Sequence, residues 1–125
     1  VCDRGINACP PLLVGVGIGT CADSAGALSK KALLRPVGSR NPLPDAARME
    51  IVLKEALNDI GIGPNALKGR ESVLDVHVEF AAHHPATLAV GVSLGCWATR
   101  RGVISFDEKL DFKITSHKTA SEVLK

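Results

Sequence analysis

The stretch Cys9–Thr20 constrains the fold of this chain more than any other part of the sequence. It begins with a cysteine and two prolines, which fix the backbone and keep a helix from starting there. The apolar run Leu12–Ile18 that follows has a length that suits a buried strand. Glycine takes every second position in and just after this run, at Gly15, Gly17 and Gly19. We therefore expect a buried strand with one bare face, on which another backbone, a cofactor or a ligand can lie closely.

A helix is expected directly after this strand. Thr20 and Asp23 form a start signal of the capping-box type in front of alanine-rich sequence, and the first helix is predicted over Ala22–Leu34. A cysteine, a glycine strand and a helix N-terminus together would form a suitable wall for a bound anion or metal cluster.

The composition excludes several classes of protein. A chain of 125 residues forms one domain or part of one, and its 46% of hydrophobic residues suffice for a core that must be aliphatic, because only 3% of the residues are aromatic. The net charge of +2 is spread along the chain without a basic block, which argues against a nucleic-acid surface. No apolar run reaches the roughly 20 residues of a membrane span, and no signal peptide is present. We expect a soluble cytoplasmic protein.

The cysteines favour free thiols. Their spacing, at Cys2, Cys9, Cys21 and Cys96, does not match a zinc ribbon or finger. Without a secretory signal, thiols in a reducing compartment are favoured over disulfides. The chain begins without methionine, which we attribute to processing or to its being a fragment.

A second helix follows a proline-rich loop. Its apolar residues recur at helical spacing, at Met49, Val52, Leu53, Ala56, Leu57 and Ile60. Asp45 is expected to cap its start, and Gly61 fits the position after its end.

The second half of the chain predicts strands. Val73–Phe80 alternates, with Leu74, Val76, Val78 and Phe80 on one face. The opposite face is wet, ligand-facing or ion-paired, because it carries Val73, Asp75, His77 and Glu79.

A further alternating strand and a hairpin complete the predicted elements. The strand spans Leu88–Leu94, and the segments Val103–Phe106 and Leu110–Ile114 predict a β-hairpin. The residues from Ser116 onward are expected to form a polar tail or a frayed helix. The predicted fold class is α/β of the mixed α+β type, a small sheet of mostly buried strands with two main helices and a C-terminal hairpin, in one domain over residues 1–125.

Each candidate site has an ordinary structural explanation. The pattern G-x-G-x-G-T is neither a Rossmann fingerprint nor a P-loop, so close packing explains its glycines better than nucleotide binding does. Taken alone, Cys9 and Cys96 read as buried inert thiols. His77 and Glu79 suggest an ordinary ion pair, and His83 and His84 suggest solvated loop residues. The residues by themselves name no reaction.

Several segments, in order, carry a resemblance to a known family. They are Cys9–Pro11 with Val14–Gly19, Lys30–Arg35, Gly61–Pro64, Val76–Glu79 and His84–Cys96. The chain resembles the class I fumarase and tartrate dehydratase family of iron–sulfur hydro-lyases over nearly its whole length. Thr20 and Cys21 depart from the family's usual glycine and threonine at that point.

The resemblance implies a [4Fe–4S] cluster held by three cysteines, with an open iron that acts as a Lewis acid on the substrate. It assigns two ligands to Cys9 and Cys96 and places the third upstream. It assigns substrate binding to His84, twelve positions before Cys96. Arg100 and Arg101, just past that cysteine, are weaker candidates for the same anionic environment, with ordinary solvated arginines as the alternative. The glycines of the first strand, Gly15, Gly17 and Gly19, would form the wall beside the cofactor.

The expected function is therefore that of one part of a hydro-lyase. The chain would be the C-terminal part of an α-type region, the substrate a dicarboxylate of the fumarate/malate type, and the partner a β-type subunit or domain in a homo- or hetero-oligomer. The chain alone is expected to be inactive and to hold no intact cluster, and no catalytic base is identified. The alternatives are a non-enzymatic iron–sulfur or nucleotide-binding module, and a purely structural fragment.

These assignments imply three structural expectations. The glycine strand is buried, with the first helix starting beside it. The thiols of Cys9 and Cys96 lie near each other without a disulfide, and Cys2 and Cys21 do not join them. His84 faces the same cleft as Cys96.

Overall fold

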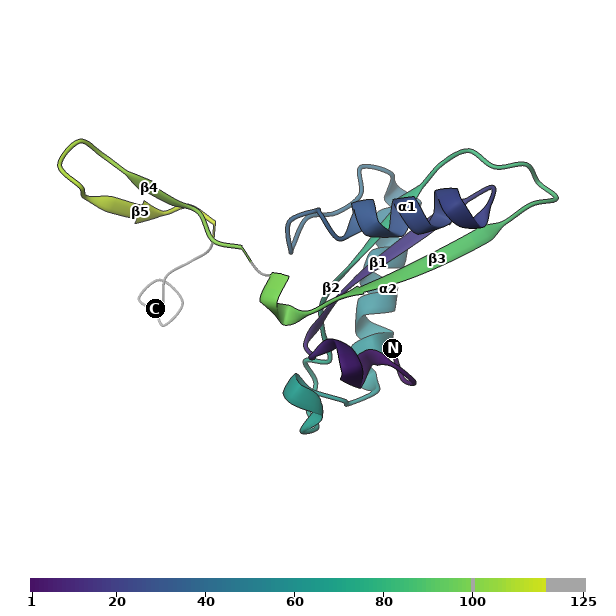
Figure 1. Ribbon diagram of the computed structural model, residues 1–125, viewed down its shortest axis with the longest axis horizontal. Helices are drawn as coiled ribbons and strands as arrows, with labels where there is room; N and C mark the ends of the chain where they lie inside the picture. Colours follow the sequence, from purple (N-terminus) through teal and green to yellow (C-terminus); the bar gives the residue numbers. More distant parts are fainter. Residues whose placement is uncertain (100, 117–125) are drawn as a thin grey trace.

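The computed structural model describes residues 1–99 and 101–116 (Figure 1). The first half of the chain contains η1 (Gly5–Ala8), β1 (Leu12–Gly19), α1 (Ala22–Ala32) and α2 (Pro44–Asp59). The second half contains η2 (Pro64–Ala66), β2 (Val73–Phe80), β3 (Ala89–Gly95), η3 (Trp97–Thr99), β4 (Ile104–Phe106) and β5 (Phe112–Ile114). Two helices, a small sheet and a C-terminal hairpin confirm the predicted mixed α+β class.

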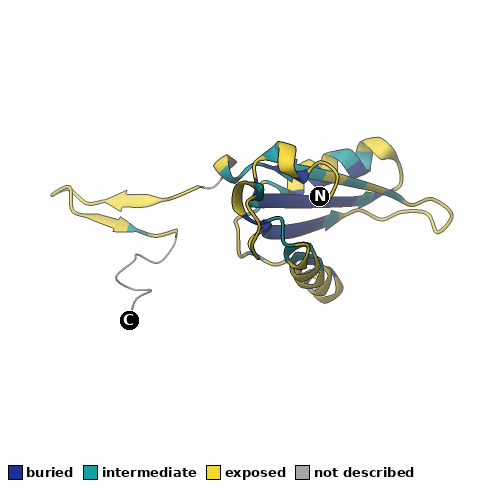
Figure 2. Cartoon of the chain, turned by 90° about the horizontal axis from the view of Figure 1, so that it is seen from below, coloured by how far each residue is buried: buried dark blue, intermediate teal, exposed yellow. Residues whose placement is uncertain are grey.

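A three-stranded mixed sheet forms the middle layer. Its strand order is β2-β1-β3, with β1 parallel to β2 and antiparallel to β3. Helix α1 packs on one face and α2 on the other (Figure 2). No helix in the described part of the chain is long and apolar enough to cross a membrane.

The aliphatic core lies on the α2 face of the sheet. Its buried members come from β1 and β2: Leu12, Val14, Val16, Val73, Val76 and Val78. Leu53 and Leu57 of α2 pack against them. Burial of each such side chain contributes about 1.5–3 kcal/mol, so this layer supplies most of the hydrophobic stabilisation.

The opposite face of β1 is the glycine face, and helix α1 covers it. A Cβ atom added to Gly15 would meet the carbonyl oxygen of Ser29, and one added to Gly17 would meet backbone atoms of Ala25 and Ser29. The predicted burial of β1 is confirmed, as is the start of the first helix beside it. Since the helix backbone lies directly on the strand, glycine is required there for close packing.

The N-terminus of α1 differs from the prediction by one residue. The N-cap is Cys21, and Ser24 completes the capping box, whereas Thr20 and Asp23 were expected in these positions. The Cys21 backbone N–H donates to Ser24 Oγ at 3.2 Å, and Ser24 Oγ donates to the Cys21 carbonyl at 2.9 Å. The serine hydroxyl both accepts and donates here, so it closes the first turn better than an aspartate would.

A register irregularity changes the predicted faces of β2. Leu12 pairs with Val73 and Leu13 with Asp75, so Leu74 is passed over. Val73 therefore joins Val76 in the core, although strict alternation had placed it on the polar face. The polar face is ion-paired, one of the predicted options, and it is buried.

Helix α2 presents a different face to the core from the predicted one. Leu53 and Leu57 pack inward as expected, but Met49, Val52 and Ile60 are exposed, and the fully buried residues are Ala46 and Glu50. Glu50 is buried because its carboxylate accepts hydrogen bonds from other segments.

The ends of α2 were predicted in part. Leu43 is the N-cap and Pro44 the first helical residue, so Asp45 lies in the first turn and is not the cap. Gly61 follows the helix with φ +73°, the left-handed conformation expected of a glycine at that position.

Besides the outer face of α2, apolar side chains of β3 and of the hairpin are exposed in the described part of the chain. On the α2 face, the β3 residues Val90 and Val92 are more than half exposed, at 57% and 60%. The hairpin β4–β5 confirms the predicted pairing, and Figure 1 shows it apart from the sheet, with Phe106 and Phe112 exposed. The predicted tail beyond Ser116 lies outside the described residues.

Two glycine substitutions separate close packing from backbone flexibility. Gly17→Ala places a Cβ against the α1 backbone, and we expect it to lower the free energy of unfolding by about 2–3 kcal/mol. Gly26→Ala, within α1 and with open space around its Cβ, should raise it by about 0.5–1 kcal/mol. Urea unfolding of both variants measures the difference, and equal effects would contradict the packing assigned to α1.

Candidate functional site

The sheet topology brings Cys9 and Cys96 to the same end of the sheet. Cys9 lies just before β1 and Cys96 just after β3, and the antiparallel pairing of Leu13 with Gly95 aligns these two ends. The Trp97 backbone N–H donates to the Cys9 carbonyl at 3.5 Å. The two cysteines, far apart in sequence, are therefore held side by side through their backbones.

The two thiols interact without a disulfide bond. Their side chains share a hydrogen bond, which, with the electrostatic effect of Cys96, raises the pKa of the Cys9 thiol. Neither cysteine is in a disulfide, and Cys9 is exposed while Cys96 is half-buried. The Ala98 backbone N–H also donates to Cys96 Sγ at 3.4 Å. The expected proximity of unbonded thiols thus agrees with the structure.

The local backbone at Cys9 is unusual. Cys9 adopts the left-handed conformation with φ 56° and ψ 77°, and the Pro10–Pro11 peptide bond that follows is cis. A non-glycine residue in such a conformation costs about 1–3 kcal/mol and is found most often at functional sites. The Cys9 side chain is therefore held by a turn and lies outside the regular strand.

No third ligand joins this pair within residues 1–99 and 101–116. No group of three His, Cys, Asp or Glu side chains in that part of the chain could hold a metal ion. Cys21 lies at the other end of β1, where Ser24 bonds its thiol and lowers its pKa. Two thiolates, which are suitable ligands for iron–sulfur groups, are the donor set that this chain offers.

His84 does not face the same cleft as Cys96 within this chain, so that expectation is wrong. His84 lies in the loop before β3 and Cys96 after it, at opposite ends of a seven-residue strand. At about 3.4 Å per step, the two ends of this strand are roughly 20 Å apart. The loop lies at the Cys21 end of the sheet, where Thr20 Oγ1 donates to the Ala82 carbonyl at 3.4 Å.

The two loop histidines are exposed, as the solvated interpretation expects. His84 Nδ1 accepts a hydrogen bond from the Ala86 backbone N–H at 3.1 Å. His83 Nδ1 lies 3.3 Å from the His84 carbonyl. Their partners belong to the loop itself, so the Nε2 atoms are the groups left for a ligand.

Of the two arginines after Cys96, the structure describes Arg101. Arg100 lies outside the described residues. Arg101 Nη2 donates to the Leu34 carbonyl at 3.1 Å, just past the end of α1. This contact ties the segment after the cysteine to the helix on the glycine face.

The glycines predicted as a cofactor wall have neighbours of their own. Gly15 and Gly17 lie against the α1 backbone, and a Cβ on Gly19 would lie 2.6 Å from Ser24 Oγ. In this chain helix α1 occupies the bare face. A role beside a cofactor stays a prediction.

Sequence reasoning missed the burial of three ionisable side chains. Glu50, Asp75 and His77 have no exposed surface. Glu50 accepts from Arg35 Nη1 at 2.6 Å and from the backbone N–H groups of Asn41 and Val78. This buried carboxylate therefore ties α2 to β2 and to the loop between the helices.

The Asp75 carboxylate ties β2 to the beginning of the loop between the two helices. It accepts from the Gly38 backbone N–H at 2.6 Å and from Arg40 at 3.0 Å, and its Oδ2 lies 3.4 Å from His77 Nε2. Burial alone would raise the pKa of Asp75, but the interactions with His77 and Arg40 and two backbone N–H groups hold it well below its usual value. His77 Nδ1 donates to the Ala32 carbonyl at 3.2 Å. The expected His77–Glu79 pair is replaced by Asp75–His77.

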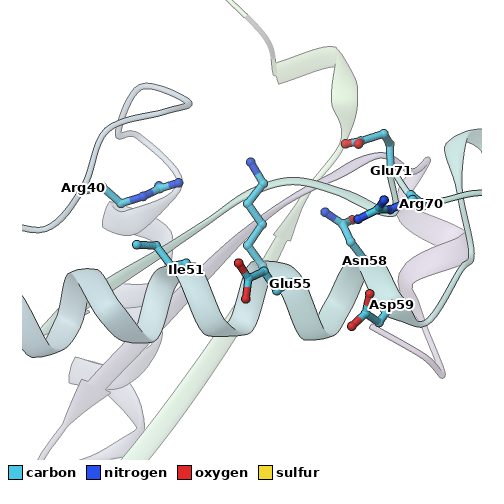
Figure 3. A pocket seen from close by; sticks show the side chains of 8 residues that line it. Arg40, Ile51, Glu55, Asn58, Asp59, Arg70 and Glu71 are labelled. Carbon is cyan, nitrogen blue, oxygen red and sulfur yellow. The ribbon is translucent and has the colours of Figure 1, made fainter.

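A surface pocket of about 220 Å³ lies beside α2 (Figure 3). Its lining residues carry both charges, at Arg40, Ile51, Lys54, Glu55, Asn58, Asp59, Arg70 and Glu71. None of the predicted site residues lines it, and its balanced charge favours neither an anion nor a cation.

Comparisons with known proteins give consistent matches. The family model described as Fumarate hydratase (Fumerase) matches residues 1–105. The L(+)-tartrate dehydratase subunit alpha of Escherichia coli (strain K12) is 55% identical over 112 residues, which cover 90% of this chain and 37% of that protein. The putative L(+)-tartrate dehydratase subunit alpha of Methanocaldococcus jannaschii is 45% identical over 112 residues, covering 88% and 39%. The chain thus spans less than two fifths of the length of these relatives.

The buried carboxylate of Asp75 predicts a pH dependence of stability. A lowered pKa in the folded state stabilises the fold above the unfolded value of about 3.9, and this contribution is lost as the pH falls. Asp75→Asn should lower the free energy of unfolding by about 3 kcal/mol at pH 7, because Arg40 and His77 lose a charged partner.

Urea unfolding between pH 7 and pH 3 measures this effect. The difference between the parent chain and Asp75→Asn should shrink toward pH 3. The exposed Asp111→Asn serves as the control and should change stability little. A difference that stays constant across this pH range would refute the ionised state assigned to Asp75.

Proposed function

The chain belongs to the class I fumarase and L-tartrate dehydratase family, and on that premise we propose that it is the C-terminal, cluster-binding part of an α-type hydro-lyase region. The complete enzyme would reversibly add water to a small dicarboxylate of the fumarate/malate type. The adjacent thiols of Cys9 and Cys96 carry the proposal. In the described part of the chain they are the only pair of neighbouring thiols, and they stand where the family has two of its cluster cysteines.

Cys9 and Cys96 would bind two corners of a [4Fe–4S] cluster. Thiolates held at one end of a sheet fit such a group, and the third cysteine would come from a part of the protein outside this chain. When bound, the cluster supplies a Lewis acid that polarises the substrate's hydroxyl group. The Ala98 N–H group, which points at Cys96 Sγ, would lower the negative charge on that sulfur.

Substrate binding is assigned to His84, Arg100 and Arg101. The arginines follow Cys96 closely in sequence and suit the carboxylates of the substrate. His84 lies before β3, at the opposite end of that strand from Cys96. To bind the substrate of a cluster, His84 would need the cluster cysteines of a neighbouring subunit or of another part of the polypeptide beside it. The glycine strand would form the wall near the cluster at its cysteine end.

The partners we propose are a β-type subunit or domain in an oligomer. The name of the relatives, subunit alpha, supports a partner subunit. The exposed apolar side chains of β3, of α2 and of the hairpin support the same proposal, since such patches mark interaction surfaces. The four free cysteines agree with a location in the cytoplasm.

Anaerobic reconstitution of the complete α-type protein with its partner tests the function. After loading with iron and sulfide, we expect hydration of fumarate or turnover of L-tartrate, with mesaconate as a third substrate. Cys9→Ser and Cys96→Ser should each lower the iron and sulfide content and reduce turnover more than about 100-fold, because a ligand matters more than its outer partners.

The controls lie in the same chain. Cys21→Ser should keep the cluster, because its position at the start of α1 accepts serine as a cap. His84→Asn should impair turnover of the loaded protein far more than His83→Asn. Full cluster content in Cys9→Ser and Cys96→Ser would refute the ligand assignment, and a loaded protein without hydratase activity would favour a non-enzymatic iron–sulfur module.

A further inference from the structure

The paired thiols also suit a second chemistry. We propose that Cys9 and Cys96 are a thiol-oxidation site, which forms a reversible intrachain disulfide when no cluster occupies it. Neither cysteine is in a disulfide, and their side chains already share a hydrogen bond. The disulfide itself does not depend on the proposed function, although its consequence for cluster assembly does.

The backbone holds the two residues in a suitable arrangement. The β1–β3 ladder and the bond from Trp97 N–H to the Cys9 carbonyl fix the distance between the two segments. A disulfide requires Cα atoms less than about 7 Å apart. Cys9 lies in a turn before the ladder begins, so a bond to its sulfur involves no residue of the sheet itself on that side.

Access to an oxidant differs between the two sulfurs. Cys9 is exposed and Cys96 is half-buried, so a peroxide reaches Cys9 first. The Cys9 thiolate attacks the peroxide, an S–O bond forms as the O–O bond breaks, and a sulfenic acid and water result. The Cys96 thiolate then attacks that sulfur, the S–S bond forms, and the hydroxyl group leaves as a second water after taking up a proton. Overall two thiols are oxidised and one hydrogen peroxide is reduced to two waters.

The other two cysteines lack this arrangement. Cys21 lies at the opposite end of β1 with its thiol bonded to Ser24. Cys2 is exposed, and it forms no group with Cys9 and Cys96 that could hold a metal ion. Disulfide formation, which needs a second thiol beside the first, should therefore be confined to the Cys9–Cys96 pair.

The disulfide would protect the cluster ligands. A lone sulfenic acid proceeds to sulfinic and sulfonic acids, which cells rarely reverse, whereas a disulfide returns to two thiols on reduction. An oxidised pair cannot bind iron until it is reduced. A chain that has lost its cluster would thus be stored in a form from which the cluster can be rebuilt.

Mass spectrometry of the cluster-free 125-residue chain tests this site. The reduced chain is treated with one equivalent of hydrogen peroxide, and free thiols are then alkylated under denaturing conditions. We expect a loss of about 2 Da for the two hydrogens removed, a joined pair of peptides carrying Cys9 and Cys96, and alkylated Cys2 and Cys21. Dithiothreitol should restore four alkylatable thiols.

Two cysteine variants and a measurement of thermal stability serve as controls for folding defects. Cys21→Ser should form the same disulfide, whereas Cys9→Ser should leave Cys96 reduced or further oxidised. The disulfide should also raise the thermal midpoint, because it closes a long loop in the unfolded chain. Sulfinic acid at Cys9, or pairing of Cys9 with Cys2 or Cys21, would overturn the proposal.

The outcomes separate this inference from the proposed function. A disulfide in the isolated chain, combined with failure of the complete protein to bind a cluster, would leave the oxidation site standing and remove the proposed enzyme. A complete protein that loads its cluster, combined with no disulfide in the isolated chain, would support the cluster assignment and overturn the oxidation site.

Discussion

Helix α1 lies with its backbone directly on the glycines of β1, and much of the remaining structure depends on this contact. Gly15 and Gly17 of β1 lie directly against the backbone of α1. Gly91 of the neighbouring strand β3 lies against the backbone of Ala25 in the same helix. The helix can therefore span β1 and β3 at once, where Ser29 and Ser93 share a hydrogen bond of 2.8 Å. Its end then directs the following loop over the outer edge of β2, where two buried carboxylates hold it.

Strand direction, in turn, decides which residues meet. Because β1 is parallel to β2 and antiparallel to β3, the start of β1 lies beside the end of β3. Cys9 and Cys96 come together there, while Cys21 and the histidine loop lie at the opposite end. The same arrangement leaves the β3 side chains Val90 and Val92 uncovered on the α2 face of the sheet. This apolar surface is available to the partner subunit proposed above.

Local patterns predicted the elements well. The glycine strand, the start of α1, the hairpin and Gly61 follow from periodicity, prolines and turn chemistry within a few residues. The burial of Glu50 and Asp75 could not be predicted, because their partners Arg35 and Arg40 come from other segments. The expected shared cleft of His84 and Cys96 overlooked the predicted strand Leu88–Leu94, which lies between them and places them at opposite ends. The proximity of Cys9 and Cys96 was predicted from the family resemblance, because the residues alone do not say that β1 and β3 become antiparallel neighbours.

The central claim is that the fold alone brings Cys9 and Cys96 into contact, ready to bind a shared group. Its most direct test is a bifunctional bimane reagent, which becomes fluorescent only when both of its arms are bound to thiols. In a reduced, anaerobic chain with Cys2→Ser and Cys21→Ser, the account predicts rapid fluorescence and one cross-linked product per chain. Addition of urea before the reagent should abolish it. Two separate single-arm adducts on the folded chain would contradict the account.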